Sequence, residues 1–199
     1  TTNNPYKSYY TKTRTQKEDF KYGVKAVKEI TDYYRVKQDN SEELYDSRII
    51  STTYDYSSYN GTTATLKLEA IENASKYSGM ANEVVSLVNE LRTSLNKSTL
   101  SLDSNLTTMA MIRAMELSYG NTFSHDRPDG SSCFTLGYEF GQLFYAENIA
   151  HSQSTPNAVF TSWKNSSGHY QNMIGDYTKI GIGINYFNGR YYWVQVFGY

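Results

Sequence analysis

The residues best suited to chemistry lie in a polar, glycine- and serine-containing stretch between positions 123 and 172. His125 lies near its start, Glu147 lies between the two histidines, and His169 follows a glycine near its end. Imidazole and carboxylate groups are the usual components of a transition-metal site or an acid/base site. If the fold brings the three side chains together, this stretch supplies one of these two kinds of site.

Three segments of this stretch resemble, in this order, the signature of the CAP superfamily. They are FSHDRPDG (123–130), ENIA (147–150) and SSGHYQNM (166–173). The superfamily comprises cysteine-rich secretory proteins, antigen 5 and pathogenesis-related class 1 proteins, and its domains are also called SCP-like. The resemblance covers about residues 80–199. In its Gly-His step and its ending, YYWVQVFG, the sequence is most similar to bacterial members. The resemblance implies an α/β fold, a three-layer α/β/α sandwich.

The resemblance also implies a cleft that is lined by two histidines and two acidic residues, in which several members bind a divalent metal. His125, Glu147 and His169 match three of these positions, but the acid expected on the helix that carries Trp163 is missing. Three ligands and a water can hold zinc. His125 and His169 are therefore the candidate metal ligands. The alternative is that the two histidines only form hydrogen bonds that hold loops together.

Other titratable residues near these motifs have simpler interpretations. In an extended segment Glu147 and Ile149 point to the same side, and a buried carboxylate there needs partners, for which the two imidazoles are natural. His151 shares that face but lies about 13 Å along the strand, so we expect an incidental surface histidine. Glu116 also matches a family position, and we expect it to pair locally or to face water rather than to enter the site.

The composition excludes several classes of protein. The net charge is −1, which gives no basis for electrostatic binding of nucleic acid. No apolar run approaches the roughly 20 residues of a transmembrane helix. Cys133 is the single cysteine, so no intrachain disulfide forms, unlike in typical eukaryotic CAP proteins, and we expect a small buried residue there. The sequence also lacks the Gly-x-Ser-x-Gly and His-Glu-x-x-His motifs of common hydrolases.

The apolar pattern predicts the elements that must position the site. A stripe predicts a helix over residues 81–95, and a second helix begins at Asp103 or Ser104 and ends at Gly120. A third helix starts at Thr155 and Pro156, and a short fourth one holds His169. Alternating residues then predict a C-terminal hairpin over residues 180–197, with a tight turn at Asn-Gly 188–189.

The organisation we expect is a Tyr-rich, partly helical N-terminal extension over residues 1–79, followed by the CAP domain over residues 80–199. Residues 1–15 are expected to be a linker, and the apolar spacing predicts a helix over residues 16–37. A short strand is expected at 48–54, whereas residues 65–77 are ambiguous between helix and strand.

The function we expect is that of an exported or surface-associated bacterial CAP domain, extracellular or at the cell surface, whose cleft binds a peptide, a glycan or a lipid. The resemblance admits sterol and lipid binding. The alternative is a metal-dependent hydrolase in which the histidines hold zinc and Glu147 acts as the general base. A third hypothesis is an adhesion module that uses the Tyr-rich extension as its contact surface. The chain starts at Thr1 without a methionine, so we expect a processed or trimmed chain.

Overall fold

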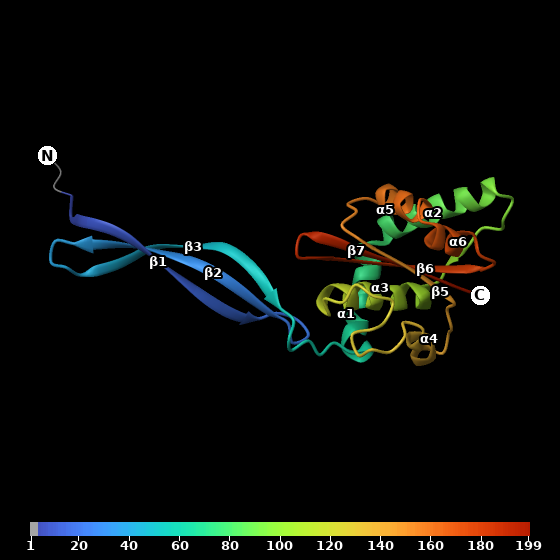
Figure 1. Ribbon diagram of the computed structural model, residues 1–199, viewed down its shortest axis with the longest axis horizontal. Helices are drawn as coiled ribbons and strands as arrows, with labels where there is room; N and C mark the ends of the chain where they lie inside the picture. The colour runs from blue at the N-terminus through green and yellow to red at the C-terminus, as the bar shows by residue number, and fades with distance from the viewer. Residues whose placement is uncertain (1–3) are drawn as a thin grey trace. The chain divides into compact units, whose positions relative to one another are not determined.

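The computed structural model describes residues 4–199. The chain divides into two compact units between Asn60 and Gly61, whereas the sequence placed the boundary after residue 79. Residues 1–3 of the expected linker lie outside the described residues. The two units appear in Figure 1.

The first unit is an antiparallel three-stranded sheet of order β1-β2-β3. Its strands are β1 (Tyr6–Asp19), β2 (Lys25–Lys37) and β3 (Glu42–Asp55). The predicted linker is therefore wrong from Tyr6 onwards, and the predicted helix over 16–37 is also wrong. The strand expected at 48–54 is confirmed as part of β3.

The failed helix prediction has a physical reason in β2. Its buried side chains Ala26, Ile30 and Asp32 all occupy even positions, which is the two-residue alternation of a strand. Apolar residues four positions apart fit a helix face and a strand face equally well, so their spacing did not decide between them.

The second unit is a sandwich of helices around a four-stranded sheet. Its helices are α1 (Thr63–Lys76), α2 (Ser78–Ser94), α3 (Ser104–Tyr119), α4 (Thr135–Phe140), α5 (Pro156–Lys164) and α6 (Ser167–Ile174). Its strands are β4 (Ser101–Leu102), β5 (Ala146–His151), β6 (Lys179–Phe187) and β7 (Arg190–Gly198). Helices α1 and α3 pack on one face of the sheet, and α2, α5 and α6 cover the other, as Figure 1 shows. The predicted three-layer α/β/α architecture is confirmed.

The sheet has the order β4-β6-β7-β5. The predicted hairpin is formed by β6 and β7, and its turn has positive φ at both Asn188 (48°) and Gly189 (78°), as a primed turn requires. Strand β7 lies between two neighbours and buries Trp193 through Phe197, so it is a central strand that is covered on both faces.

Helix α3 is the central helix of this unit. Asp103 caps it by accepting a hydrogen bond from the Leu106 backbone N–H at 2.9 Å, and all its residues from Met109 to Tyr119 are buried. Gly183 of β6 lets the helix approach closely, because a Cβ there would lie 1.9 Å from the backbone oxygen of Ala110. This contact fixes α3 against the sheet, and α3 in turn carries part of the site.

Helix α1 resolves the ambiguous segment, because residues 65–77 are helical up to Lys76. Its Thr62–Thr65 capping box fixes the start, and Leu66 and Ala70 are fully buried. Asn73 donates a hydrogen bond to the Asn185 side chain at 3.2 Å. The second unit therefore includes a helix that the sequence analysis assigned to the extension. Among the described helices, none is long and apolar enough to cross a membrane.

Candidate functional site

The structure brings His125 and Glu147 into direct contact. Strand β5 presents Glu147, the loop after α3 presents His125, and the His125 Nδ1 lies 2.9 Å from the Glu147 Oε1. Glu147 is buried, whereas 57% of the His125 side chain is exposed. The carboxylate thus holds the imidazole by one nitrogen while the ring faces solvent.

The second partner of Glu147 is Arg113, not the second imidazole that the sequence suggested. Arg113 Nε donates to Glu147 Oε2 at 2.8 Å, and Nη1 donates to Glu116 Oε2 at 2.7 Å. The guanidinium is fully buried. An arginine suits this place better than a histidine, since it is always charged and its planar fork reaches two carboxylates at once.

These contacts continue into a buried ion chain, which we define as His125, Glu147, Arg113, Glu116 and Arg127. Arg127 donates to Glu116 Oε1 from Nε at 2.9 Å and from Nη2 at 2.7 Å. Glu116 does pair locally, as expected, but it is buried rather than open to water. Each buried charge in the chain has an opposite partner, which burial of charge requires.

The two matched histidines have opposite electrostatic environments. The hydrogen bond that the Glu147 carboxylate accepts from the imidazole raises the pKa of His125, although burial opposes this shift. Burial lowers the pKa of His169, and the charge of His125 lowers it further. His125 therefore keeps its proton to a higher pH than an ordinary histidine, and His169 loses its proton at a lower pH.

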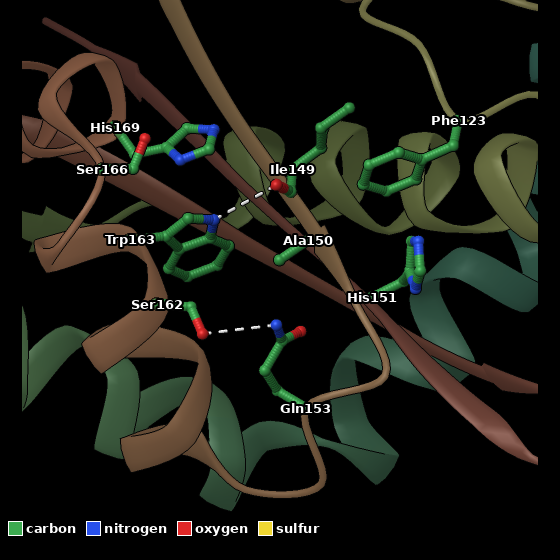
Figure 2. Close-up of a pocket in the computed structure, with 9 residues that line it drawn as sticks. All are labelled: Phe123, Ile149, Ala150, His151, Gln153, Ser162, Trp163, Ser166 and His169. Atoms are coloured by element: carbon green, nitrogen blue, oxygen red, sulfur yellow. Dashed lines mark hydrogen bonds between the residues drawn. The ribbon is translucent and has the colours of Figure 1, made fainter.

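His169 lines a different cavity from His125. It lies at the start of α6, in a cavity of about 350 Å³ that also contains Trp163 and His151. Figure 2 shows the Trp163 indole donating to the Ile149 backbone oxygen, at 3.3 Å, with Phe123 and His151 on the other side of β5. The structure thus joins His125 to Glu147 and places His169 in the neighbouring cavity. His151 also lines this cavity and does not line the one at Glu147; its ring meets the Phe123 ring edge-on, with centroids 4.5 Å apart.

The cavity next to His125, called the His125 cleft below, has a volume of about 300 Å³. The residues that line it are His125, Asp126, Ser132, Cys133, Phe134, Tyr145, Ala146, Glu147 and Asn172. Cys133 is buried, as predicted, and burial raises its pKa to about 12. The thiol therefore stays protonated and is not a nucleophile at neutral pH.

The cysteine-rich secretory protein family (CAP) matches residues 85–197 of this chain. The chain belongs to the CAP family. The uncharacterized protein YkwD of Bacillus subtilis (strain 168) is 32% identical over 126 residues, which are 62% of this chain and 48% of that protein. The chain thus spans about half the length of this curated relative. The resemblance to bacterial CAP proteins that the motifs indicated is confirmed.

Two solved structures are similar to this CAP protein. An extracellular protein containing a SCP domain from Bacillus anthracis str. Ames matches with a TM-score of 0.55 and 17% identity, over 94% of this chain and 67% of that one. An outer surface protein from Borrelia burgdorferi matches with a TM-score of 0.51 and 26% identity, over 57% of this chain and 87% of that one. The first likeness supports the fold alone.

The donor atoms of this CAP domain do not form a complete metal site. Within residues 4–199, no group of three or more His, Cys, Asp or Glu side chains is arranged to hold an ion. Both carboxylate oxygens of Glu147 are hydrogen-bonded, one to Arg113 and one to His125. The two imidazoles are then the remaining candidate ligands, whereas a catalytic zinc ion is usually held by three protein ligands. The metal site at His125 and His169 stays a prediction from the sequence.

The sequence analysis missed the roles of Arg113 and Arg127. A signal for the first was present: Arg113 and Glu116 lie three residues apart in the otherwise apolar run MAMIRAMEL, and such a pair inside a core helix implies burial with mutual neutralisation. Arg127 forms part of a turn, in which its backbone N–H donates to the Ser131 backbone oxygen at 2.7 Å. Its side-chain role depends on tertiary contacts that no local pattern contains.

Proposed function

We propose that this CAP domain is an extracellular or surface-associated ligand-binding module that uses the His125 cleft. The observation that carries the proposal is that buried Glu147 fixes the His125 imidazole at Nδ1, so the exposed ring meets the cavity in one orientation. A polar group that is held before binding loses little conformational freedom when a ligand arrives.

The proposed location is supported by the compared proteins. One similar structure is described as an extracellular protein and another as an outer surface protein. A ligand of this module would accordingly be a molecule found outside the cell or on its surface.

Binding fits the cleft better than hydrolysis does. A general base needs an oxygen or nitrogen that can reach the substrate proton, and both Glu147 oxygens already accept hydrogen bonds. The thiol of Cys133 is buried and protonated. Asp126, Ser132 and Asn172 supply polar contacts without forming a nucleophile–base pair, which is the pattern of a recognition site.

A fragment screen by ligand-observed NMR tests this proposal. We expect some fragments to bind the wild-type chain and to lose binding in His125→Ala. The matched control is His151→Ala, which removes another imidazole that lies outside the His125 cleft and should leave those fragments bound. Binding that is unchanged in His125→Ala, or no binding at all, would overturn the proposal.

A further inference from the structure

The His125 cleft continues into a second cavity that is lined almost entirely by aromatic rings. This second cavity has a volume of about 250 Å³, and its lining residues are Phe134, Tyr138, Leu143, Phe144 and Tyr145. Phe134 and Tyr145 line both cavities. The two cavities therefore form one groove, called the aromatic groove below, with His125 at its polar end and Tyr138 at its aromatic end.

Three rings of this groove are exposed to solvent, and two of them are held in place by ring contacts. Tyr138 is 75% exposed, Tyr145 52% and Phe134 40%. Phe134 rests against buried Phe144, with ring centroids 5.2 Å apart, and Tyr145 contacts Tyr199 at the same separation. Rings that are supported from behind present a stable apolar surface, and they lose little freedom when a ligand covers them.

The charges at the groove argue against an anionic polymer. Among the described residues that line the two cavities, none is a lysine or an arginine, and two are the acids Asp126 and Glu147. Recognition of a phosphate or a carboxylate chain depends on such cations. These walls therefore do not suit an anionic ligand, and Glu147, which is already paired with Arg113 and His125, is not free to bind a cation.

The walls also argue against an acyl chain and against an extended peptide. Tyr138 is three-quarters exposed, so this end cannot enclose a hydrocarbon tail. A peptide strand would need the outer edge of β5. There the backbone oxygen of Glu147 already accepts a hydrogen bond from the Asn172 side chain at 3.4 Å, and that of Ile149 accepts one from the Trp163 indole at 3.3 Å. The edge is thus already capped by side chains at these positions.

We propose that the aromatic groove binds a neutral oligosaccharide. The C–H faces of the sugar rings would lie on Tyr138 and Tyr145, since the negative face of an aromatic ring attracts weakly positive hydrogens. The sugar hydroxyls would exchange hydrogen bonds with His125, Asp126 and Ser132 at the polar end. This inference rests on the proposed function, because it assigns a ligand class to the same cleft and its aromatic continuation.

Calorimetric titration of the full chain with three soluble probes tests this inference: cellotetraose, maltotetraose and the tetramer of N-acetylglucosamine. We expect at least one probe to bind. Tyr138→Ala and Tyr145→Ala should each weaken that binding at least about fivefold. Tyr186→Ala is the matched control, because Tyr186 is also half exposed but lies on β6 outside the groove, and it should bind as the wild type does. Thermal melts verify that all variants are folded.

Two results would overturn the saccharide inference: no binding of any probe at millimolar concentration, or binding that both groove variants leave unchanged. The fragment screen separates this failure from that of the proposed function. Fragments that need His125, together with probes that do not bind, would leave a ligand-binding cleft of another specificity. If a probe loses binding in Tyr145→Ala but binds unchanged in His125→Ala, the aromatic site would be supported and the proposed role of His125 would be rejected.

Discussion

The imidazole of His125 is held by a carboxylate that is itself paired with a buried guanidinium. This order of contacts determines its protonation, because the hydrogen bond to Glu147 raises the pKa of His125. We expect Glu147→Gln to bring that pKa down towards the ordinary value of about 6.5. The pKa of His125 is measured by following the histidine ring protons by NMR during a pH titration, with His151 as the internal reference. An unchanged His125 pKa in the variant would contradict this account.

The same shift predicts how stability depends on pH. A histidine whose pKa is higher in the folded than in the unfolded chain stabilises the fold fully at pH below about 6.5, and this contribution disappears as the pH rises through the raised pKa. The stability advantage of wild type over His125→Asn should therefore shrink between pH 6 and pH 8. The effect should be small, because the side chain is more than half exposed. Urea unfolding at several pH values measures it, and an advantage that grows with pH would have the wrong sign.

Arg113 is the residue on which the buried ion chain depends most. Arg113→Met would leave Glu147 without its guanidinium partner and Glu116 paired with Arg127 alone. We expect a loss of about 3–5 kcal/mol in the free energy of unfolding. Arg190→Met, at an exposed position of β7, is the control and should change it by less than about 0.5 kcal/mol. A loss below about 1 kcal/mol for Arg113→Met would show that the buried ion chain contributes little to the stability of the fold.

At the scale of residues, the sequence predicted which side chains could take part in a site, but not which of them form ion pairs with one another. His125 and Glu147 were found because each lies in a motif of its own. Arg113 lies 34 positions before Glu147, and only the packing of α3 against the sheet makes them neighbours. Glu116 was matched to a family position but was expected to pair locally or to face water, because its burial beside Arg127 involves a loop that local spacing does not place. Such convergence depends on tertiary structure and leaves little trace in local spacing.

At the scale of elements, α3 and β6 approach each other closely at Gly183. Gly183→Ala would place a Cβ 1.9 Å from the Ala110 oxygen, so the helix or the strand must move. We expect a loss of about 3 kcal/mol or more by urea unfolding. Gly79→Ala, where a Cβ meets nothing within 4 Å, should instead stabilise α2 by about 0.5–1 kcal/mol. Equal effects of the two substitutions would refute the close-approach argument.

The elements also show where local patterns suffice. The Asp103 cap, the Pro156 start and the Asn188–Gly189 turn each have a short-range physical cause, and each was predicted. Strand β2 was mistaken for a helix because Ile30 and Tyr34, four residues apart, fit both periods. Only its pairing with β1 and β3 decides the matter, and pairing is a non-local property.

At the scale of the whole molecule, α1 determines where the CAP unit begins. The sequence places the start of the CAP domain at residue 80, but Leu66 and Ala70 of α1 are fully buried in the second unit. Removing α1 would expose the surface of α3 that it covers. We therefore expect residues 61–199 to unfold cooperatively, and residues 80–199 to melt at a lower temperature or without a cooperative transition. Calorimetric melts of both fragments measure this, and equal melting temperatures would show that α1 is dispensable.

The most direct test of the central claim, that the His125 cleft is a binding site, is a map of where bound fragments lie. Two-dimensional NMR of histidine and tyrosine ring resonances in the full chain reports this for each fragment that binds. The account predicts that binding fragments shift the rings of His125 and Tyr145 together and leave Tyr186, which lies outside the groove, unchanged. Fragments that bind yet leave the His125 ring unshifted would contradict it.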